Sequence, residues 1–199
     1  YAYTALLLVL LTFGMETTFF RFVNKEGTDA KRTYSTILIM ISTIAATFVT
    51  LVLVFLKPVA TFAGYPDHPD YVGIMCLCVA LDAFQCIPFA YLRQNKRPVK
   101  FVALKLLFIV LNITFNVVYF VALPALFANE ATHSFASVFY DPSVGVGYVF
   151  RINLFCTLLI TFFFWKELTG FRYVFDRALC RRMLSYSWPI LLLGLAGIL

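Results

Sequence analysis

Ionisable residues lie within or at the edge of apolar runs that are each long enough to cross a lipid bilayer. A helical crossing takes about 20 apolar residues, and five runs of this kind carry Glu16, Arg21, Asp82, Lys105 and Arg151. A charge at membrane depth costs at least ~2.5 kcal/mol, so such a residue usually faces a cavity or a partner group. The combination favours a transport protein whose function lies where these charges meet.

The composition excludes a water-soluble domain of this size. Hydrophobic residues make up 62% of the 199 positions, charged residues make up 13%, and 23 positions are Phe. Uninterrupted runs favour helices over the alternating strands of a barrel. We therefore expect an all-α polytopic transmembrane helix bundle with about five complete helices and a truncated sixth. The runs cover about 1–22, 35–57, 71–92, 101–123 and 146–166, and the sixth opens near Ser187 and stops at Leu199.

The basic residues predict the orientation. Threading the runs back and forth places every Lys and Arg except Lys57 and Arg151 on one side. The positive-inside rule makes that side cytoplasmic. The net charge of +6 is then explained by topology, and no nucleic-acid partner is expected.

The ends of the chain predict a fragment. The first residue is Tyr1, the sixth run is interrupted, and the first run must travel from outside to inside. We expect residues 1–199 to form a single helical lobe that lacks sequence at both ends.

Cysteine and histidine patterns predict no metal site, no disulfide framework and no cofactor. Cys76 and Cys78 are two residues apart, which turns them about 200° away from each other on a helix. His68 and His133 fall in expected loops without acidic or thiol neighbours at ligand spacing. The cysteines are interpreted as apolar packing residues.

Polar residues inside the runs follow helical stripes. Lys105, Asn112 and Asn116 are separated by seven and four residues, which puts them on one face. Such stripes either join helices through hydrogen bonds or line a polar path. A second stripe repeats every four residues: Asn153, Thr157 and Thr161.

The carboxylates and arginines point beyond simple helix association. Glu16 and Asp82 are expected to line an aqueous path or to pair with a buried cation. Glu16 and Arg21 lie about 140° apart on a helix, so each needs a partner elsewhere. Lys105 is equally well explained by snorkelling to headgroups, and Arg151 by an interfacial anchor or by a cation at the mouth of a cavity. Two prolines mark expected kinks within runs: Pro88 and Pro189.

Four segments in the same order resemble bacterial polysaccharide flippases. The segment GMETTFFRF at 14–22 resembles their second helix, and PFAYLR at 88–93 with the basic 94–98 resembles the end of the fourth. LNITFN at 111–116 resembles the fifth helix, and YSWP at 186–189 resembles the start of the seventh. These are the Wzx-type members of the superfamily that also holds the multidrug and toxic compound exporters, and the chain resembles the N-terminal lobe of such a MATE-like transporter.

The resemblance implies export of a lipid-linked oligosaccharide for polysaccharide biosynthesis, such as that of lipopolysaccharide. The expected substrate is an isoprenoid-diphosphate-linked oligosaccharide, moved from the cytoplasmic to the outer leaflet of the bacterial inner membrane by alternating access of two lobes. The expected partners are this substrate, membrane lipids and a C-terminal lobe of the same chain, and the first helix is expected to be missing too. Arg21 and Arg151 are candidates for the diphosphate, and Asn112 and Asn116 for sugar hydroxyls.

Glu16 and Asp82 are the candidates for binding a coupling proton or sodium ion. A multidrug antiporter of the same fold would use these acids to exchange cations, and it remains the alternative. A membrane-embedded transferase is less favoured, because Asp67, His68 and Asp70 lie between prolines and are typical of a turn rather than of a catalytic cluster. No enzymatic activity is expected.

Overall fold

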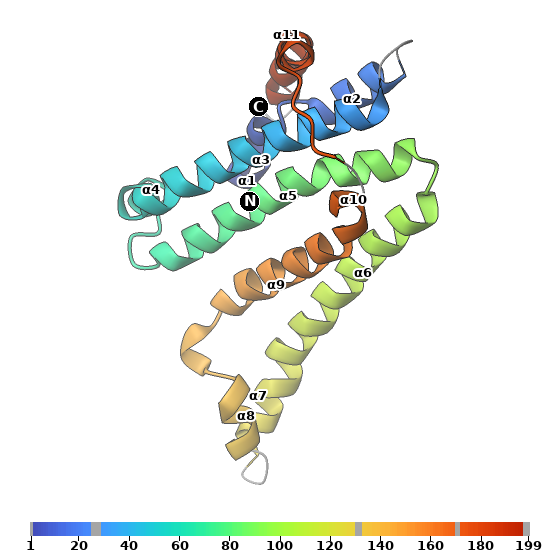
Figure 1. Ribbon diagram of the computed structural model, residues 1–199. Helices are drawn as coiled ribbons and strands as arrows, with labels where there is room; N and C mark the ends of the chain where they lie inside the picture. The colour runs from blue at the N-terminus through green and yellow to red at the C-terminus, as the bar shows by residue number, and fades with distance from the viewer. Residues whose placement is uncertain (1, 25–28, 130–132, 170–171, 197–199) are drawn as a thin grey trace.

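A computed structural model describes residues 2–24, 29–129, 133–169 and 172–196, and the secondary structure assigned in these ranges is helical throughout. The predicted all-helical fold is therefore confirmed (Figure 1). The elements are α1 (Ala2–Thr12), α2 (Met15–Val23), α3 (Ala30–Val54), α4 (Leu56–Phe62), α5 (Pro69–Gln94), α6 (Pro98–Val117), the π-helical η1 (Val118–Ala122), α7 (Leu123–Ala128), α8 (His133–Phe139), the 3₁₀ turn η2 (Pro142–Val144), α9 (Gly147–Phe163), α10 (Trp165–Thr169) and α11 (Arg177–Ala196).

Four helical stretches in the described ranges have the length and apolarity of membrane spans. They are Thr4–Val23, α3, α5 and the continuous stretch Pro98–Ala128, which runs from α6 through η1 into α7. The fifth expected crossing corresponds to α9, an apolar helix of only 17 residues. The sixth run lies in α11. This helix begins at Arg177, ten residues before the apolar part, and its first turns are polar and basic.

The first span is broken in its middle, where the sequence predicted one continuous run. Phe13 and Gly14 both have positive φ angles, 53° and 63°, and they separate α1 from α2. A Cβ atom at position 14 would lie 2.6 Å from the Cγ2 atom of Ile190 in α11. Glycine is thus required here for its backbone angle and for the close approach of α11. By contrast, α5 continues through Pro88 and α11 through Pro189.

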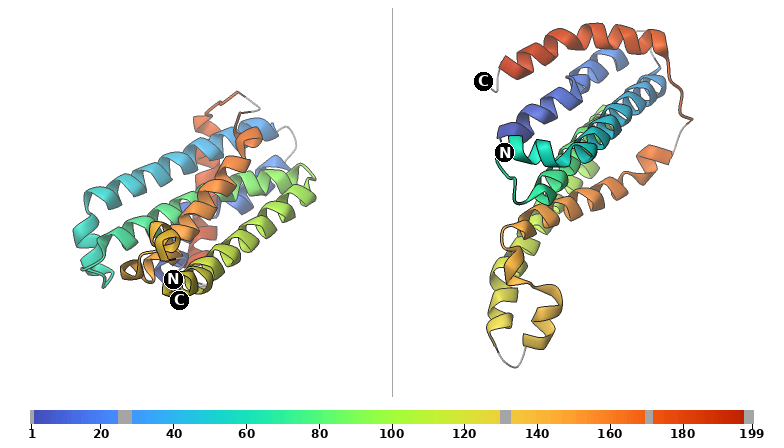
Figure 2. Two further views of the ribbon diagram at one scale, coloured as in Figure 1. Left: turned by 90° about the horizontal axis from the view of Figure 1, so that it is seen from below. Right: turned by 90° about the vertical axis from the view of Figure 1, so that its left-hand side faces the viewer.

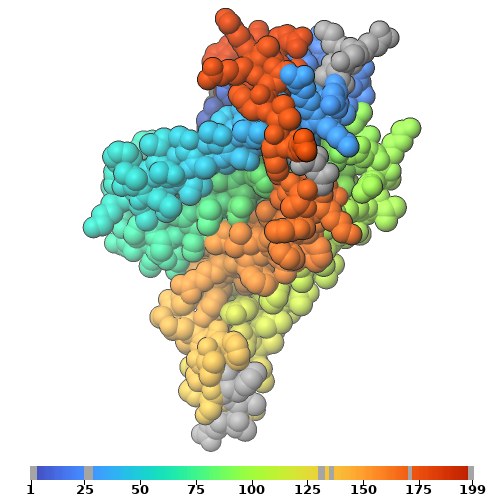
Figure 3. All heavy atoms as spheres, in the orientation of Figure 1, coloured from blue at the N-terminus to red at the C-terminus, as the bar shows by residue number. Residues whose placement is uncertain are grey.

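Helix α5 is the centre of the fold and packs against α1, α2, α3, α4, α6 and α9. Buried aromatic rings hold its basic end against α2 and α3: Tyr34 and Tyr91 stack with centroids 4.1 Å apart, and Phe19 packs edge-on to Tyr34. The stretch Pro98–Ala128 begins beside α5, diverges from it and ends with α8 in the tapered part of the molecule (Figures 2 and 3). Its apolar surface is mostly exposed, as expected of a helix that faces lipid.

The loops with the most basic residues share one end of the bundle, which we call the basic end. Gln94 donates a hydrogen bond to the Asn24 side chain, which joins the α5–α6 turn to the end of α2. Lys100 at the start of α6 forms an ion pair with Glu167 of α10. The structure thus confirms that these loops lie together, while the cytoplasmic placement of this end stays a prediction.

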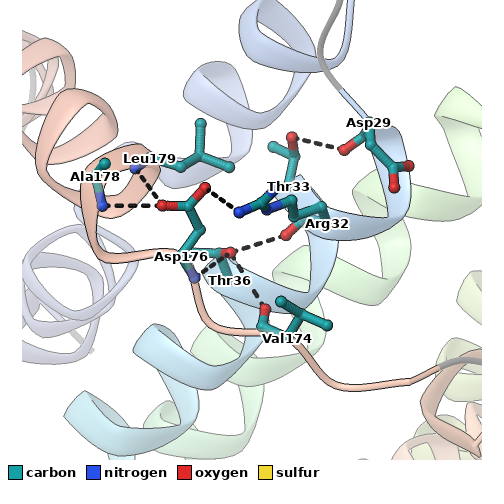
Figure 4. A network of polar contacts seen from close by, with 8 residues as sticks. All are labelled: Asp29, Arg32, Thr33, Thr36, Val174, Asp176, Ala178 and Leu179. Carbon is teal, nitrogen blue, oxygen red and sulfur yellow. Dashed lines mark hydrogen bonds and ion pairs between the residues drawn. The ribbon is translucent and has the colours of Figure 1, made fainter.

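Residues 172–176 form an extended segment before α11 at the basic end, and polar contacts hold this segment against α3 (Figure 4). Its Asp176 pairs with Arg32 at 3.0 Å, and the Thr36 hydroxyl accepts a hydrogen bond from the Asp176 backbone N–H. Hydrogen bonds from the first turn of α11 and the charge of Arg32 hold the pKa of Asp176 below its ordinary value. The Asp176 carboxylate therefore caps α11 in its ionised form.

Candidate functional site

One face of α5 carries a stripe of polar and aromatic side chains. Asp82, Cys86, Phe89 and Arg93 are separated by four, three and four residues, which aligns them along the helix. Asp82 lies at the middle of the 26-residue helix, and Arg93 lies at its basic end. The stripe therefore runs from the centre of a membrane span to its boundary.

Glu16 of α2 joins this stripe through two contacts. Its Oε1 atom forms an ion pair with the guanidinium of Arg93, and its Oε2 atom accepts a hydrogen bond from the thiol of Cys86 at 3.4 Å. The break at Phe13 and Gly14 sets the direction of α2 and so delivers Glu16 to α5. The partner that Glu16 needs outside its own helix is thus Arg93.

Aromatic rings contact Arg93 and a second cation nearby, Lys105. Arg93 lies over the rings of Phe20 and Phe101, at 5.1 and 5.4 Å from their centroids. Lys105 of α6 reaches back to α5, with its Nζ atom 4.3 Å from the centroid of Phe89. Cation–π contacts of this kind are worth about 0.5–1 kcal/mol when exposed.

Lys105 also lies close enough to Asp82 and Cys86 to interact with both electrostatically. We call Glu16, Arg93, Cys86, Asp82 and Lys105 the charge row. Three of its members, Asp82, Arg93 and Lys105, are exposed, and the other two are half-buried. The row thus presents alternating charges from α2, α5 and α6 on an open face of a membrane-length bundle.

Gln85 lies three residues after Asp82 on α5 and is directed towards α9. Its amide nitrogen donates hydrogen bonds to the Thr157 carbonyl and the Thr161 hydroxyl of α9, both at 2.8 Å. Gln85 is buried, whereas Asp82 is exposed. Gln85 and this part of the threonine stripe therefore join α5 to α9, which is the helix-association role considered for the stripe.

Arg21 lies apart from the charge row. Its guanidinium is 4.1 Å from the ring centroid of Tyr186, so Arg21 is directed towards α11. The cation beside Glu16 is therefore Arg93, which the sequence placed only among the basic loop residues. The signal that identifies Arg93 is its spacing from Asp82, which is eleven residues or close to three helical turns.

Asn112 and Asn116 are half-buried on α6 and contact each other. The amide nitrogen of Asn116 donates to the carbonyl oxygen and to the side-chain oxygen of Asn112, at 2.7 and 3.0 Å. Within the described ranges, the Asn112 amide nitrogen and the Asn116 amide oxygen make no further hydrogen bond. One donor and one acceptor thus remain available on this stripe.

Arg151 lies at the opposite end of the fold from Arg93, so the structure does not bring Arg21 and Arg151 together. It lines a pocket of about 540 Å³ between α6, η1, α8 and α9. Tyr71, in the first turn of α5 and far from Arg93, donates a hydrogen bond to the Val144 carbonyl at this pocket. The candidate residues therefore divide between the charge row, the α2–α11 contact, the asparagine stripe of α6 and this pocket.

No group of three or more His, Cys, Asp or Glu side chains in the described parts of the chain is arranged to hold a metal ion. Comparison of the chain with protein-family models, with curated proteins and with solved structures gave no significant match.

Proposed function

We propose that this chain forms part of a membrane transporter that moves an isoprenoid-diphosphate-linked oligosaccharide from the cytoplasmic to the outer leaflet by alternating access. The observation that carries the proposal is the charge row, because ions are retained along membrane-length helices mainly where they face a pathway or a substrate. The order of the flippase-like segments supports the same function. The basic end is assigned to the cytoplasm of a bacterial inner membrane under this proposal.

The charge row would allow Arg93 to change its partner from Glu16 to the substrate diphosphate during transport. Arg93 and Lys105 offer two cations to a diphosphate, and the planar guanidinium of Arg93 matches phosphate oxygens in pairs. Glu16 forms an ion pair with Arg93. A diphosphate that takes over Arg93 leaves the Glu16 carboxylate available for a coupling proton or sodium ion, and Asp82 offers a second acid midway along α5. Substrate binding and ion binding would then be linked through one ion pair.

The other proposed substrate contacts lie beside the row. Asn112 and Asn116 follow Lys105 along the same stripe of α6 and offer hydrogen bonds to sugar hydroxyls. Arg21 lies on α2 at the contact with α11, where it would attract the diphosphate to the basic end. Arg151 would meet the substrate at the far end of the path.

Charge reversal tests the central ion pair. The natural full-length protein is reconstituted in liposomes with a fluorescent isoprenoid-diphosphate oligosaccharide, and flipping is followed by access of a membrane-impermeant quencher. Glu16→Arg and Arg93→Glu each place like charges together, so we expect at least a tenfold slower rate. The double variant E16R/R93E restores the opposite charges and is expected to recover part of the rate.

Arg97→Glu is the matched control, because Arg97 is an exposed arginine in the turn between α5 and α6 and lies outside the row. Wild-type flipping by both single variants would refute the role of the charge row.

A cation-coupled multidrug antiporter is the second candidate, and the exposed carboxylate of Asp82 in the middle of α5 favours it. Under this alternative the reconstituted protein extrudes a cationic dye when a proton or sodium gradient is applied. Asp82→Asn would abolish dye extrusion, whereas Arg93→Gln would leave it intact. The flippase proposal expects no dye transport by the wild type.

A further inference from the structure

The pocket that contains Arg151 has the size and lining of a ligand site of its own. Its volume of about 540 Å³ lies within the range of small-molecule sites, roughly 300–1,000 Å³. It is lined by Phe115, Tyr119, Ser137, Val138, Phe139, Tyr140, Asp141, Val144, Tyr148, Arg151, Ile152 and Phe155. Half of the lining residues are therefore aromatic, and one cation and one anion supply the charge.

The guanidinium of Arg151 has no ion-pair or hydrogen-bond partner among the described residues. Arg151 is exposed, and within the described ranges no carboxylate or hydrogen-bond acceptor contacts it. An arginine that pairs with nothing at the wall of a pocket retains all five of its N–H donors for a ligand. The ligand groups that match the geometry of these guanidinium donors are a planar carboxylate and a phosphate.

Asp141 supplies the complementary acceptor. The backbone N–H and the side chain of Ser143 hold the pKa of Asp141 below its ordinary value, and the charge of Arg151 contributes in the same direction. The phenol oxygen of Tyr148 accepts a hydrogen bond from the Asp141 backbone N–H at 2.7 Å and so fixes the loop. The ionised Asp141 side chain retains acceptor capacity for hydroxyl groups of a ligand.

The aromatic side chains of the pocket pack against one another in pairs. Tyr148 packs against Tyr119 with centroids 4.8 Å apart and stacks on Tyr140 at 5.7 Å, while Phe115 meets Phe155 edge-on at 5.5 Å. Tyr119 lies in the π-helical segment Val118–Ala122, just before Pro124, which has no N–H to continue the helical ladder. Segments of π-helix of this kind are frequent at functional sites.

We propose that this pocket binds an acidic sugar, with the carboxylate on Arg151, ring hydroxyls on Asp141 and the apolar face of the ring against the tyrosines. The assignment rests on the proposed function only for the source of the ligand, an acidic sugar of the lipid-linked oligosaccharide at the outer end of the path. A phosphatidylglycerol headgroup is less well matched, because it has no ring to lie against the tyrosines.

A binding experiment on the purified protein in neutral detergent tests the pocket without any transport step. The probes are a trigalacturonate and its methyl ester, which has the same rings and hydroxyls without the negative charge, and binding is measured by calorimetry. We expect the acid to bind at least tenfold more tightly than the ester. Arg151→Gln is expected to remove that preference, and Asp141→Asn to weaken binding of both probes.

Arg172→Gln is the matched control, because Arg172 is an exposed arginine at the basic end. Equal affinity for acid and ester, or unchanged binding by Arg151→Gln with native helicity, would overturn the proposal. Loss of sugar binding on addition of phosphatidylglycerol micelles, with direct binding of that lipid to the wild type and not to Arg151→Gln, would assign the pocket to a lipid headgroup and also overturn it.

The two proposals fail separately. Equal binding of acid and ester by a wild-type protein that does flip a lipid-linked oligosaccharide removes the sugar pocket and leaves the proposed function. Tight binding of trigalacturonate by a protein that flips no lipid-linked substrate leaves the pocket and removes the transport assignment.

Discussion

The buried ion pair at the basic end gives a stability prediction whose size follows from the structure. Lys100 Nζ lies 2.8 and 2.6 Å from the two carboxylate oxygens of Glu167 and also donates to the Phe163 carbonyl at 3.3 Å. The Glu167 side chain is only 4% exposed, whereas that of Lys100 is 31% exposed. Lys100→Met leaves a buried carboxylate without its cation, a loss that costs about 3–5 kcal/mol for fully buried pairs.

Because Lys100 is partly exposed, we reduce the expected loss for Lys100→Met to about 2–3 kcal/mol. Glu167→Gln keeps an acceptor for Lys100 and is expected to cost about 1–2 kcal/mol. The double variant K100M/E167M removes both charges and is expected to lie within about 1 kcal/mol of the wild type. The two single losses are thus strongly non-additive.

The measurement is reversible unfolding in mixed detergent micelles, with each variant compared at the same protein concentration. Lys57→Met is the matched control, because Lys57 is exposed at the opposite end of the bundle and its loss is expected to change stability by less than about 0.5 kcal/mol. A Lys100→Met variant as stable as the control, or a double variant less stable than both singles, would show that the pair does not hold α6 to α10.

Three further substitutions test other parts of the fold. Gly14→Ala forces a side chain into a left-handed position and against Ile190, so we expect a loss of about 1–2 kcal/mol or more, partly recovered in G14A/I190A. Gln85→Leu removes both hydrogen bonds to α9 and is expected to cost about 1 kcal/mol in the same unfolding assay, with an unchanged value arguing against this contact. Asp176→Ala is expected to lower the melting temperature at neutral pH. Because the folded-state pKa of Asp176 is depressed, its stabilisation is present above the ordinary value and is lost as the pH falls through the folded pKa, so the wild type and Asp176→Ala should converge in acid. A pH-independent difference would contradict this.

The sequence was most informative about properties that depend on one helix at a time. Run length and apolarity predicted a helical membrane protein, and helical spacing correctly aligned Asn112 with Asn116. Spacing also indicated that Glu16 and Arg21 point in different directions. The break at Phe13 and Gly14 escaped prediction, because a single glycine inside an apolar run does not by itself distinguish a broken helix from a continuous one.

Which charged side chains meet was decided by the tertiary structure. Glu16 and Arg93 are far apart in the sequence, and periodicity fixes the face of each residue on its own helix without fixing which faces pack together. The direction of α2 after its break and the central position of α5 bring the two residues into contact and leave Arg21 against α11. Likewise, the packing of α9 made Gln85 a buried helix contact and left Asp82 exposed. The sequence by itself therefore determined that charges lie along membrane-length helices, and only the packing of those helices decided which of them form a site.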